Sequence, residues 1–128
     1  MLDVDDFKLF NDTWGHAAGD EILRELGSLL LRQVRGEDIA CRYGGDEFIL
    51  ILPDASQQVT RERAELICKQ AKRFHLQFDG HSPAAVTLSL GVAVFPDHGV
   101  TSTGLLRAVD AALYRAKHEG RNRVVVAG

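Results

Sequence analysis

The stretch IACRYGGDEFILIL, residues 39–52, decides the fold of this 128-residue chain. Apolar runs over residues 39–43 and 48–52 flank a double glycine, and a proline follows the second run. Two short apolar runs around glycine predict a β-hairpin, because glycine accepts the positive φ of a tight turn at no steric cost. The middle of the chain is therefore expected to supply an antiparallel strand pair.

Helices and strands are expected on both sides of this hairpin. Apolar residues recur at helical spacing in three segments, with Thr60 as the expected N-cap of the second, and apolar runs predict further strands. The expected helices span residues 17–34, 60–74 and 105–118, and the expected strands span residues 1–4, 39–43, 48–52, 86–95 and 123–127. Polar segments over residues 5–16 and through Gly80 and Pro83 separate them. This mixture predicts one domain of the α/β (α+β) class, with a mainly antiparallel central sheet flanked by helices.

Composition restricts the possible functions. Apolar residues make up 45% and charged residues 26%, as in an ordinary globular protein. The net charge of −3 argues against a general nucleic-acid-binding surface, which is normally basic. No apolar run is long enough to cross a membrane and the acidic start is unlike a secretory leader, so a cytoplasmic location is expected, whether or not the parent protein is membrane-attached. Cys41 and Cys68 are too few for a disulfide framework and are expected to be reduced and mostly buried.

Carboxylates gather at two places. Asp46 and Glu47 open the second strand of the hairpin, and Asp3 lies at the end of the first expected strand, with Lys8 shortly after it. If these strands are neighbours, Asp3 and Asp46 can share a hard cation such as Mg²⁺, which takes carboxylates and substrate phosphates as ligands. The alternative is that both groups are solvated acids at a turn and a strand end.

Two further pairs of residues indicate nucleotide recognition. Asn11 and Asp20 together offer the donors and acceptors that can read guanine, although both types are also common helix caps. Lys117 and Arg121 are four residues apart at a helix end, a spacing that would place two cations on one face to hold phosphates. Their alternative role is to complement the helix dipole.

Four ordered motifs together resemble the GGDEF family of diguanylate cyclases. Residues 42–48 match its signature loop, residues 2–20 its LDxDxFKxxND…GHxxGD segment, and residues 87–99 its TxSxGxAxxPxxG stretch. Residues 105–124 match its LLxxADxALYxAKxxGRNRV closing segment, with Val109 in place of alanine. The resemblance covers essentially the whole chain, and agreement of four motifs at the right spacing is far more specific than any one of them.

The resemblance implies a metal site and a nucleotidyl-cyclase or polymerase-palm-like fold. Asp3 and Asp46 would bind Mg²⁺ (or Mn²⁺), helped by the carbonyl of Val4, and Glu47 would assist metal binding or proton transfer. Asp46, Glu47 and Asp3 are accordingly the expected catalytic residues. The family's usual first helix and the start of its first strand have no counterpart here, so the resemblance indicates an N-terminally truncated domain over residues 1–128.

The resemblance also implies the substrate and its binding residues. Two GTP molecules would condense into cyclic di-GMP and pyrophosphate, each held by one subunit of a two-fold homodimer. The implied GTP-binding residues are Gly44 and Gly45 for close backbone approach, Asn11 and Asp20 for guanine, and Lys8, Lys117 and Arg121 for the phosphates.

A regulatory site is implied by Arg35 and Asp38. They fit the family's RxxD inhibitory motif, which binds the product cyclic di-GMP, and residues 39–43 give the family spacing to the signature loop. The alternative at this position is a solvated surface turn after a helix. For the chain as a whole, the alternatives are a catalytically weak cyclic di-GMP receptor module and a purely structural dimerisation domain, which would leave the candidate site residues unexplained.

Overall fold

The structure is a computed structural model that describes residues 1–78, 80–81 and 85–128. In chain order its elements are β1 (Leu2–Val4), α1 (Phe7–Trp14), α2 (His16–Gln33), β2 (Ile39–Arg42), β3 (Glu47–Ile51), α3 (Gln57–Ala71), β4 (Leu88–Val92), α4 (Ser102–His118) and β5 (Arg123–Val126). No helix within these residues is long and apolar enough to cross a membrane. The mixed α+β fold class expected from the sequence is confirmed.

The five strands form one sheet in the order β2-β3-β1-β4-β5. The β2–β3 hairpin, the β1–β3 pair and the β1–β4 pair are antiparallel, and only β4 and β5 run parallel. The prediction of a mainly antiparallel sheet is therefore confirmed. The short strand β1 lies at its centre, with Asp3 directly opposite Glu47 of β3.

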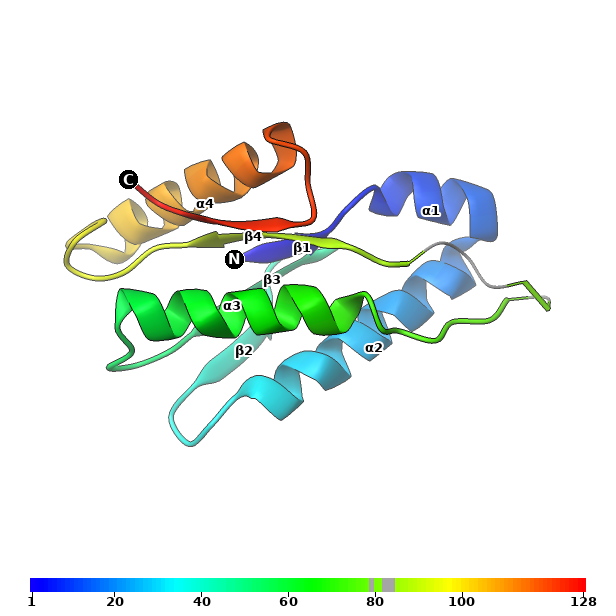
Figure 1. Cartoon of the computed structure of the whole chain (residues 1–128), viewed down its shortest axis with the longest axis horizontal. Helices are drawn as coiled ribbons and strands as arrows, with labels where there is room; N and C mark the ends of the chain where they lie inside the picture. Colours follow the sequence, from blue (N-terminus) through cyan, green and yellow to red (C-terminus); the bar gives the residue numbers. More distant parts are fainter. Residues whose placement is uncertain (79, 82–84) are drawn as a thin grey trace.

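Helices cover both faces of this sheet, with α2 and α3 on one side and α4 on the other (Figure 1). The α2–α3 side holds the main apolar core, which takes alternate residues of β1 and β4 such as Leu2, Val4 and Leu90. Because strand residues alternate between faces, Asp3 and Ser89 point to the α4 side. At Gly91 the backbone of α4 approaches β4 so closely that a Cβ would lie 2.5 Å from the carbonyl oxygen of Val109.

Helix α1 was not expected, since residues 5–16 are polar in sequence. Its apolar residues Phe7, Phe10 and Trp14 nevertheless have helical spacing, which was the available signal. The ring centroids of Phe10 and Trp14 lie 6.0 and 6.4 Å from that of Phe78, which is far away in sequence. A helix this short depends on such tertiary packing, which the local composition does not report.

Two helices begin earlier than the sequence indicated. The side chain of Ser56 accepts a hydrogen bond from the amide of Val59 at 3.2 Å, so Ser56 and not Thr60 caps α3. In the same way, the Thr101 hydroxyl accepts from the amide of Gly104 at 3.0 Å and starts α4 at Ser102. In both cases a hydroxyl cap lies ahead of the first core-facing apolar residue, and the cap determines where the helix starts.

Strand β4 is shorter than the expected strand over residues 86–95. After Val92 the chain bends, and the amide of Val94 donates to Nδ1 of His98 at 2.9 Å instead of to a neighbouring strand. Of the polar segment expected before β4, Pro83 lies outside the described residues.

The cysteine expectation is half correct. Both thiols are free, and Cys68 is buried, but Cys41 is exposed. Cys41 lies in β2, the edge strand of the sheet, where the neighbouring Ile39 is also largely exposed.

Candidate functional site

The carboxylate of Asp3 is the best-protected charge of the candidate site. Its side chain is only 3% exposed, because β1 lies between β3 and β4 and beneath the end of α4. One oxygen, Oδ2, forms an ion pair with the ammonium of Lys117. The other, Oδ1, is buried and has no hydrogen-bond partner. A buried acceptor without a partner is rare and indicates a place for another donor or a cation.

The site concentrates negative charge. Burial raises the pKa of Asp3 to about 6, the ion pair with Lys117 opposes this shift, and the nearby charges of Asp46 and Asp5 add to it. Burial lowers the pKa of Lys117, but its hydrogen bond and attraction to Asp3, together with Asp46 and Glu47, outweigh this effect and raise it. Asp46 directly precedes Glu47, the residue opposite Asp3 in the β1–β3 pair, so the hairpin acid lies close to the end of β1.

These residues suit a divalent cation shared with a ligand. Asp3 and Asp46 supply two carboxylates, and Mg²⁺ commonly takes one or two carboxylates and completes its shell with waters and phosphates. Among the described residues, no three His, Cys, Asp or Glu side chains gather into a complete protein cage. The free Oδ1 of Asp3 is the atom that such a cation would satisfy.

The hairpin turn is held by a side chain and not by left-handed glycines. Gly44 and Gly45 do not have positive φ, so the expectation of a turn made by left-handed glycines is wrong. Instead the Arg42 guanidinium donates through Nε to the carbonyl oxygens of both glycines, at 3.1 and 3.0 Å. A Cβ at Gly45 would meet nothing within 4 Å, which leaves open space over the turn.

Asn11 and Asp20 lie inside helices and cap neither of them. The N-cap of α1 is Asp6 and that of α2 is Gly15, so the capping alternative does not apply to either residue. Asn11 lies against Gly19 at the α1–α2 crossing, where its Oδ1 is buried without a partner. Asp20, one residue further along α2, is exposed.

The two basic residues near the end of α4 are arranged differently from the sequence expectation. The helix ends at His118, so Lys117 and Arg121 are not on one helical face. Arg121 follows in the left-handed conformation, with φ of 62°, and its Nε lies 3.6 Å from Oδ1 of Asp6. Both side chains nevertheless contact acids in or just after β1: Lys117 pairs with Asp3, and Arg121 lies near Asp6. The exposed Lys8 lies close by in sequence, in the first turn of α1.

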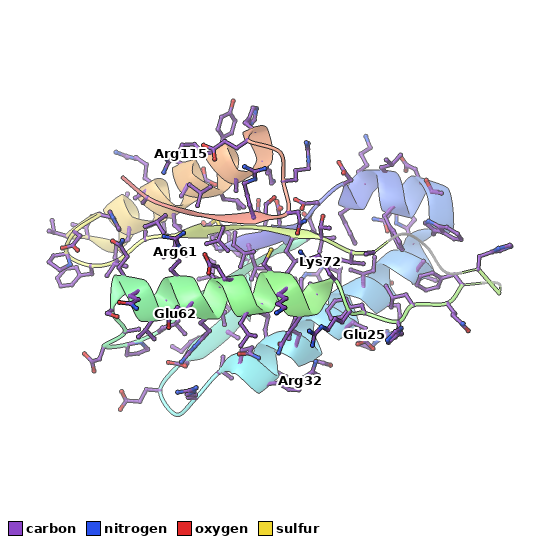
Figure 2. The ribbon with its side chains drawn as sticks, viewed as in Figure 1. Glu25, Arg32, Arg61, Glu62, Lys72 and Arg115 are labelled. Carbon is purple, nitrogen blue, oxygen red and sulfur yellow. The ribbon has the colours of Figure 1, made fainter. Side chains whose placement is uncertain are left out.

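Helix α4 is also fastened at its C-terminal half. Arg115, labelled in Figure 2, donates through Nη2 to the carbonyl oxygen of Val126 in β5 at 2.8 Å. This contact and the close approach at Gly91 together set the position of Lys117 over the sheet.

A pocket of about 260 Å³ lies beside α1 and has a mainly apolar lining that includes Leu9, Phe10 and Trp14. Asp5 and Asp6 lie at its wall, but Asn11 and Lys117 do not. The apolar pocket is therefore adjacent to the candidate site at the exit of β1 and does not contain it.

The RxxD residues form a second cluster, away from Asp3. Oδ2 of Asp38 accepts hydrogen bonds from the Arg35 amide at 3.0 Å and from Nη1 of Arg63 in α3 at 2.6 Å. The side chains of Asp38 and Arg63 are 11% and 13% exposed, whereas Arg35 is exposed. Burial acts to raise the pKa of Asp38, but both arginines outweigh it and lower it. Arg63 was not expected from the sequence, because no local signal connects it with Asp38, 25 positions away.

Comparison of the sequence and comparison of the structure with known proteins both find members of one family. The family model described as "Diguanylate cyclase, GGDEF domain" matches residues 1–123. The chain is 44% identical over 124 residues to diguanylate cyclase DosC of Escherichia coli K12, covering 97% of this chain and 27% of DosC. It is 40% identical over 131 residues to the response regulator PleD of Caulobacter vibrioides, covering 98% of this chain and 28% of PleD. The chain thus spans less than a third of these relatives.

Solved structures agree. The GGDEF domain of DgcB from Caulobacter crescentus, in complex with c-di-GMP, superposes with a TM-score of 0.91 at 37% identity, over 98% of this chain and 74% of that one. The GGDEF domain of PA1120 (YfiN or TpbB) from Pseudomonas aeruginosa also gives 0.91, at 35% identity, over 99% and 79% of the two chains.

Proposed function

The chain belongs to the GGDEF family of diguanylate cyclases, and we propose that it joins two GTP molecules into cyclic di-GMP with release of pyrophosphate. The observation that carries this proposal is the buried Asp3, directly opposite Glu47, with one oxygen paired with Lys117 and the other without a hydrogen-bond partner. A triphosphate with a bound metal ion is commonly held by a carboxylate that coordinates the metal and a lysine that contacts the phosphates, and Asp3 and Lys117 provide such a pair.

Asp3, Asp46 and the carbonyl of Val4 are the proposed ligands of Mg²⁺ or Mn²⁺, and Glu47, directly opposite Asp3, is the proposed assisting acid. The bound cation would neutralise phosphate charge and acidify the attacking hydroxyl. Binding would require Asp3 to be ionised, and Lys117 would then be released from Oδ2 to contact phosphate oxygens.

The guanine base is proposed to lie against the α1–α2 crossing, where Asn11 and Asp20 are not used as caps. The phosphates would extend from there over Gly44 and Gly45 of the hairpin turn, where the space over Gly45 is open. The proposed phosphate-binding cations are Lys8, Lys117 and Arg121. Lys8, Gly44 and Gly45 are exposed, which suits a substrate shared with a second molecule.

The reaction needs two such sites. The ribose 3′-hydroxyl of one GTP attacks the α-phosphate of the other, the new P–O bond forms, and the bond to the pyrophosphate leaving group breaks. Because one domain holds one GTP, two copies related by a two-fold axis must face each other, and each half-site completes the other. The rate should therefore rise faster than linearly with protein concentration.

The Arg35–Asp38 cluster is proposed as the site of product inhibition. Arg35 leaves its guanidinium exposed for a phosphate or guanine, while Arg63 and the Arg35 amide hold Asp38 by Oδ2. This arrangement leaves the second oxygen of Asp38 to accept from a guanine edge. Because solved relatives of the fold are complexes with c-di-GMP, a receptor module working through this cluster is the second candidate function.

Cyclic di-GMP synthesis from GTP and Mg²⁺, measured over a range of concentrations of nucleotide-free protein, tests the proposal. Asp46→Ala should abolish turnover and spare cyclic di-GMP binding, whereas Arg35→Ala should relieve inhibition and spare turnover. A folded chain that binds cyclic di-GMP but makes none at any concentration would support the receptor and refute the enzyme.

A further inference from the structure

Asp5 is the most heavily hydrogen-bonded carboxylate among the described residues, and no role described above uses it. Its Oδ1 accepts from the hydroxyl of Ser89 at 2.5 Å. Its Oδ2 accepts from the hydroxyl of Thr87 at 2.7 Å and from the backbone amide of Asn122 at 2.9 Å. Both oxygens are therefore occupied by protein donors, which distinguishes Asp5 from Asp3 and makes it a poor metal ligand.

These bonds join three parts of the chain that are distant in sequence. Asp5 follows β1 directly, Thr87 immediately precedes β4, Ser89 lies in β4, and Asn122 lies in the turn between α4 and β5. The amide of Asp5 also donates to the carbonyl oxygen of Thr87 at 3.0 Å, so the β1 exit is fixed to β4 by backbone and side chain together. The bond to Asn122 extends this rigid unit to the turn.

The turn needs such a restraint. Arg121 and Asn122 both have positive φ, 62° and 49°, a conformation that costs a non-glycine residue about 1 kcal/mol or more. The Arg121 amide donates to the carbonyl oxygen of Ala116 at 2.9 Å, which holds the start of the turn on α4. The bond from Asn122 to Asp5 holds the other end of the turn on the segment that follows β1. Arg121, between these two anchors, is thereby directed toward Asp6.

We propose that Asp5 is a positioning residue for the triphosphate of GTP: its carboxylate fixes the turn at residues 120–122 so that Arg121 faces the exit of β1. This inference rests on the proposed function, in which Arg121 holds phosphates. Asp5 itself does not touch the substrate. The residues proposed to bind guanine, Asn11 and Asp20, lie at the α1–α2 crossing. Loss of Asp5 should therefore weaken phosphate binding and leave recognition of the base unchanged.

The test compares two nucleotides by calorimetry on the whole chain in Mg²⁺. The first is 3′-deoxy-GTP, which carries the triphosphate but cannot react, and the second is GMP, which lacks the β- and γ-phosphates. Asp5→Ala should weaken binding of 3′-deoxy-GTP about tenfold, the equivalent of about 1.4 kcal/mol, and change GMP affinity less than about twofold. Asp5→Asn should lie between, because the amide oxygen can still accept from the Asn122 amide. The matched control is Asp12→Ala, which removes an exposed carboxylate of α1 and should change neither affinity.

Arg121→Ala separates the inference from the function on which it rests. If Arg121→Ala lowers 3′-deoxy-GTP affinity selectively and Asp5→Ala does not, or if Asp5→Ala weakens both nucleotides equally, the positioning role is refuted alone. If Arg121→Ala itself has no selective effect, the proposed phosphate role of Arg121 fails. Should Asp5→Ala not fold, Asp5→Asn and Thr87→Val, which keep part of the network, are judged by the same ratio of affinities.

Discussion

Substituting alanine for Gly19 tests whether the Asn11 amide reads guanine. A Cβ at Gly19 would lie 2.9 Å from Cγ of Asn11, nearer still to its Oδ1, and 3.2 Å from Cζ of Phe7. Real Cβ contacts below 3.0 Å are essentially never seen, so the amide has to leave its position over α2. The helix itself tolerates alanine well, so the change acts on the Asn11 side chain and not on α2.

The expected loss follows from the hydrogen bonds that the amide would make to the base. Each is worth about 1 kcal/mol net, and more when the partner is left buried and unpaired. Losing one or two of them should weaken GTP binding by roughly 5- to 100-fold. Gly27, on the same helix, provides the control: a Cβ there meets nothing within 4 Å. Gly27→Ala should leave affinity unchanged and stabilise α2 by about 1 kcal/mol.

The assay is titration with 3′-deoxy-GTP and 3′-deoxy-ATP. Gly19→Ala should leave the affinity for 3′-deoxy-ATP unchanged. It should lower the affinity for 3′-deoxy-GTP until the two affinities are similar. In a double-mutant cycle, the variant that carries both Asn11→Ala and Gly19→Ala should bind 3′-deoxy-GTP as tightly as Asn11→Ala alone, because both substitutions remove the same contact. Unchanged guanine affinity in Gly19→Ala, or strictly additive losses, would refute the assignment of Asn11.

Three further predictions concern regulation, packing and pH. Arg63→Ala should weaken cyclic di-GMP binding several-fold, whereas Arg61→Ala on the same helix, which breaks only an exposed pair with Glu65, should not; equal effects in calorimetry would contradict this. Gly91→Ala should destabilise the domain by about 1–3 kcal/mol in denaturant titrations, because α4 must move outward; an unchanged midpoint would argue against that packing. With a metal chelator present, the free energy of unfolding should fall as the pH rises from about 4 to about 6, because Asp3 keeps a proton in the folded state that it releases in the unfolded chain. Asp3→Asn should remove this pH dependence.

The sequence was sufficient where the signal is periodic or local. The hairpin over residues 39–52 and the helix α2 follow from apolar spacing, and the structure places both where they were expected. Helix α1 was missed because residues such as Asn11 and Asp12 favour turns, and the packing of Phe10 on Phe78 outweighs that preference.

The candidate site was predictable only in part. The expected approach of Asp3 and Asp46 depended on the first strand lying beside the hairpin, and β1 does pair with β3. The sequence motifs of the family identify which residues to consider. The assumption that Lys117 and Arg121 share a helical face was wrong, because α4 ends at His118 and the left-handed turn cannot be inferred from periodicity. Contacts such as that between Asp38 and Arg63 depend on tertiary structure, so they have no signature in a single sequence.

The position of β1 has a consequence for how the domain opens. This strand of three residues has a hydrogen-bonded neighbour on each side, β3 and β4, so it must separate from these neighbours before its amides reach solvent. The backbone around Asp3 should therefore be among the slowest to exchange its amide hydrogens for deuterium, at the free energy of global unfolding. A ligand or metal ion bound at Asp3 would then raise the free energy of unfolding of the whole domain and not only that of the local segment.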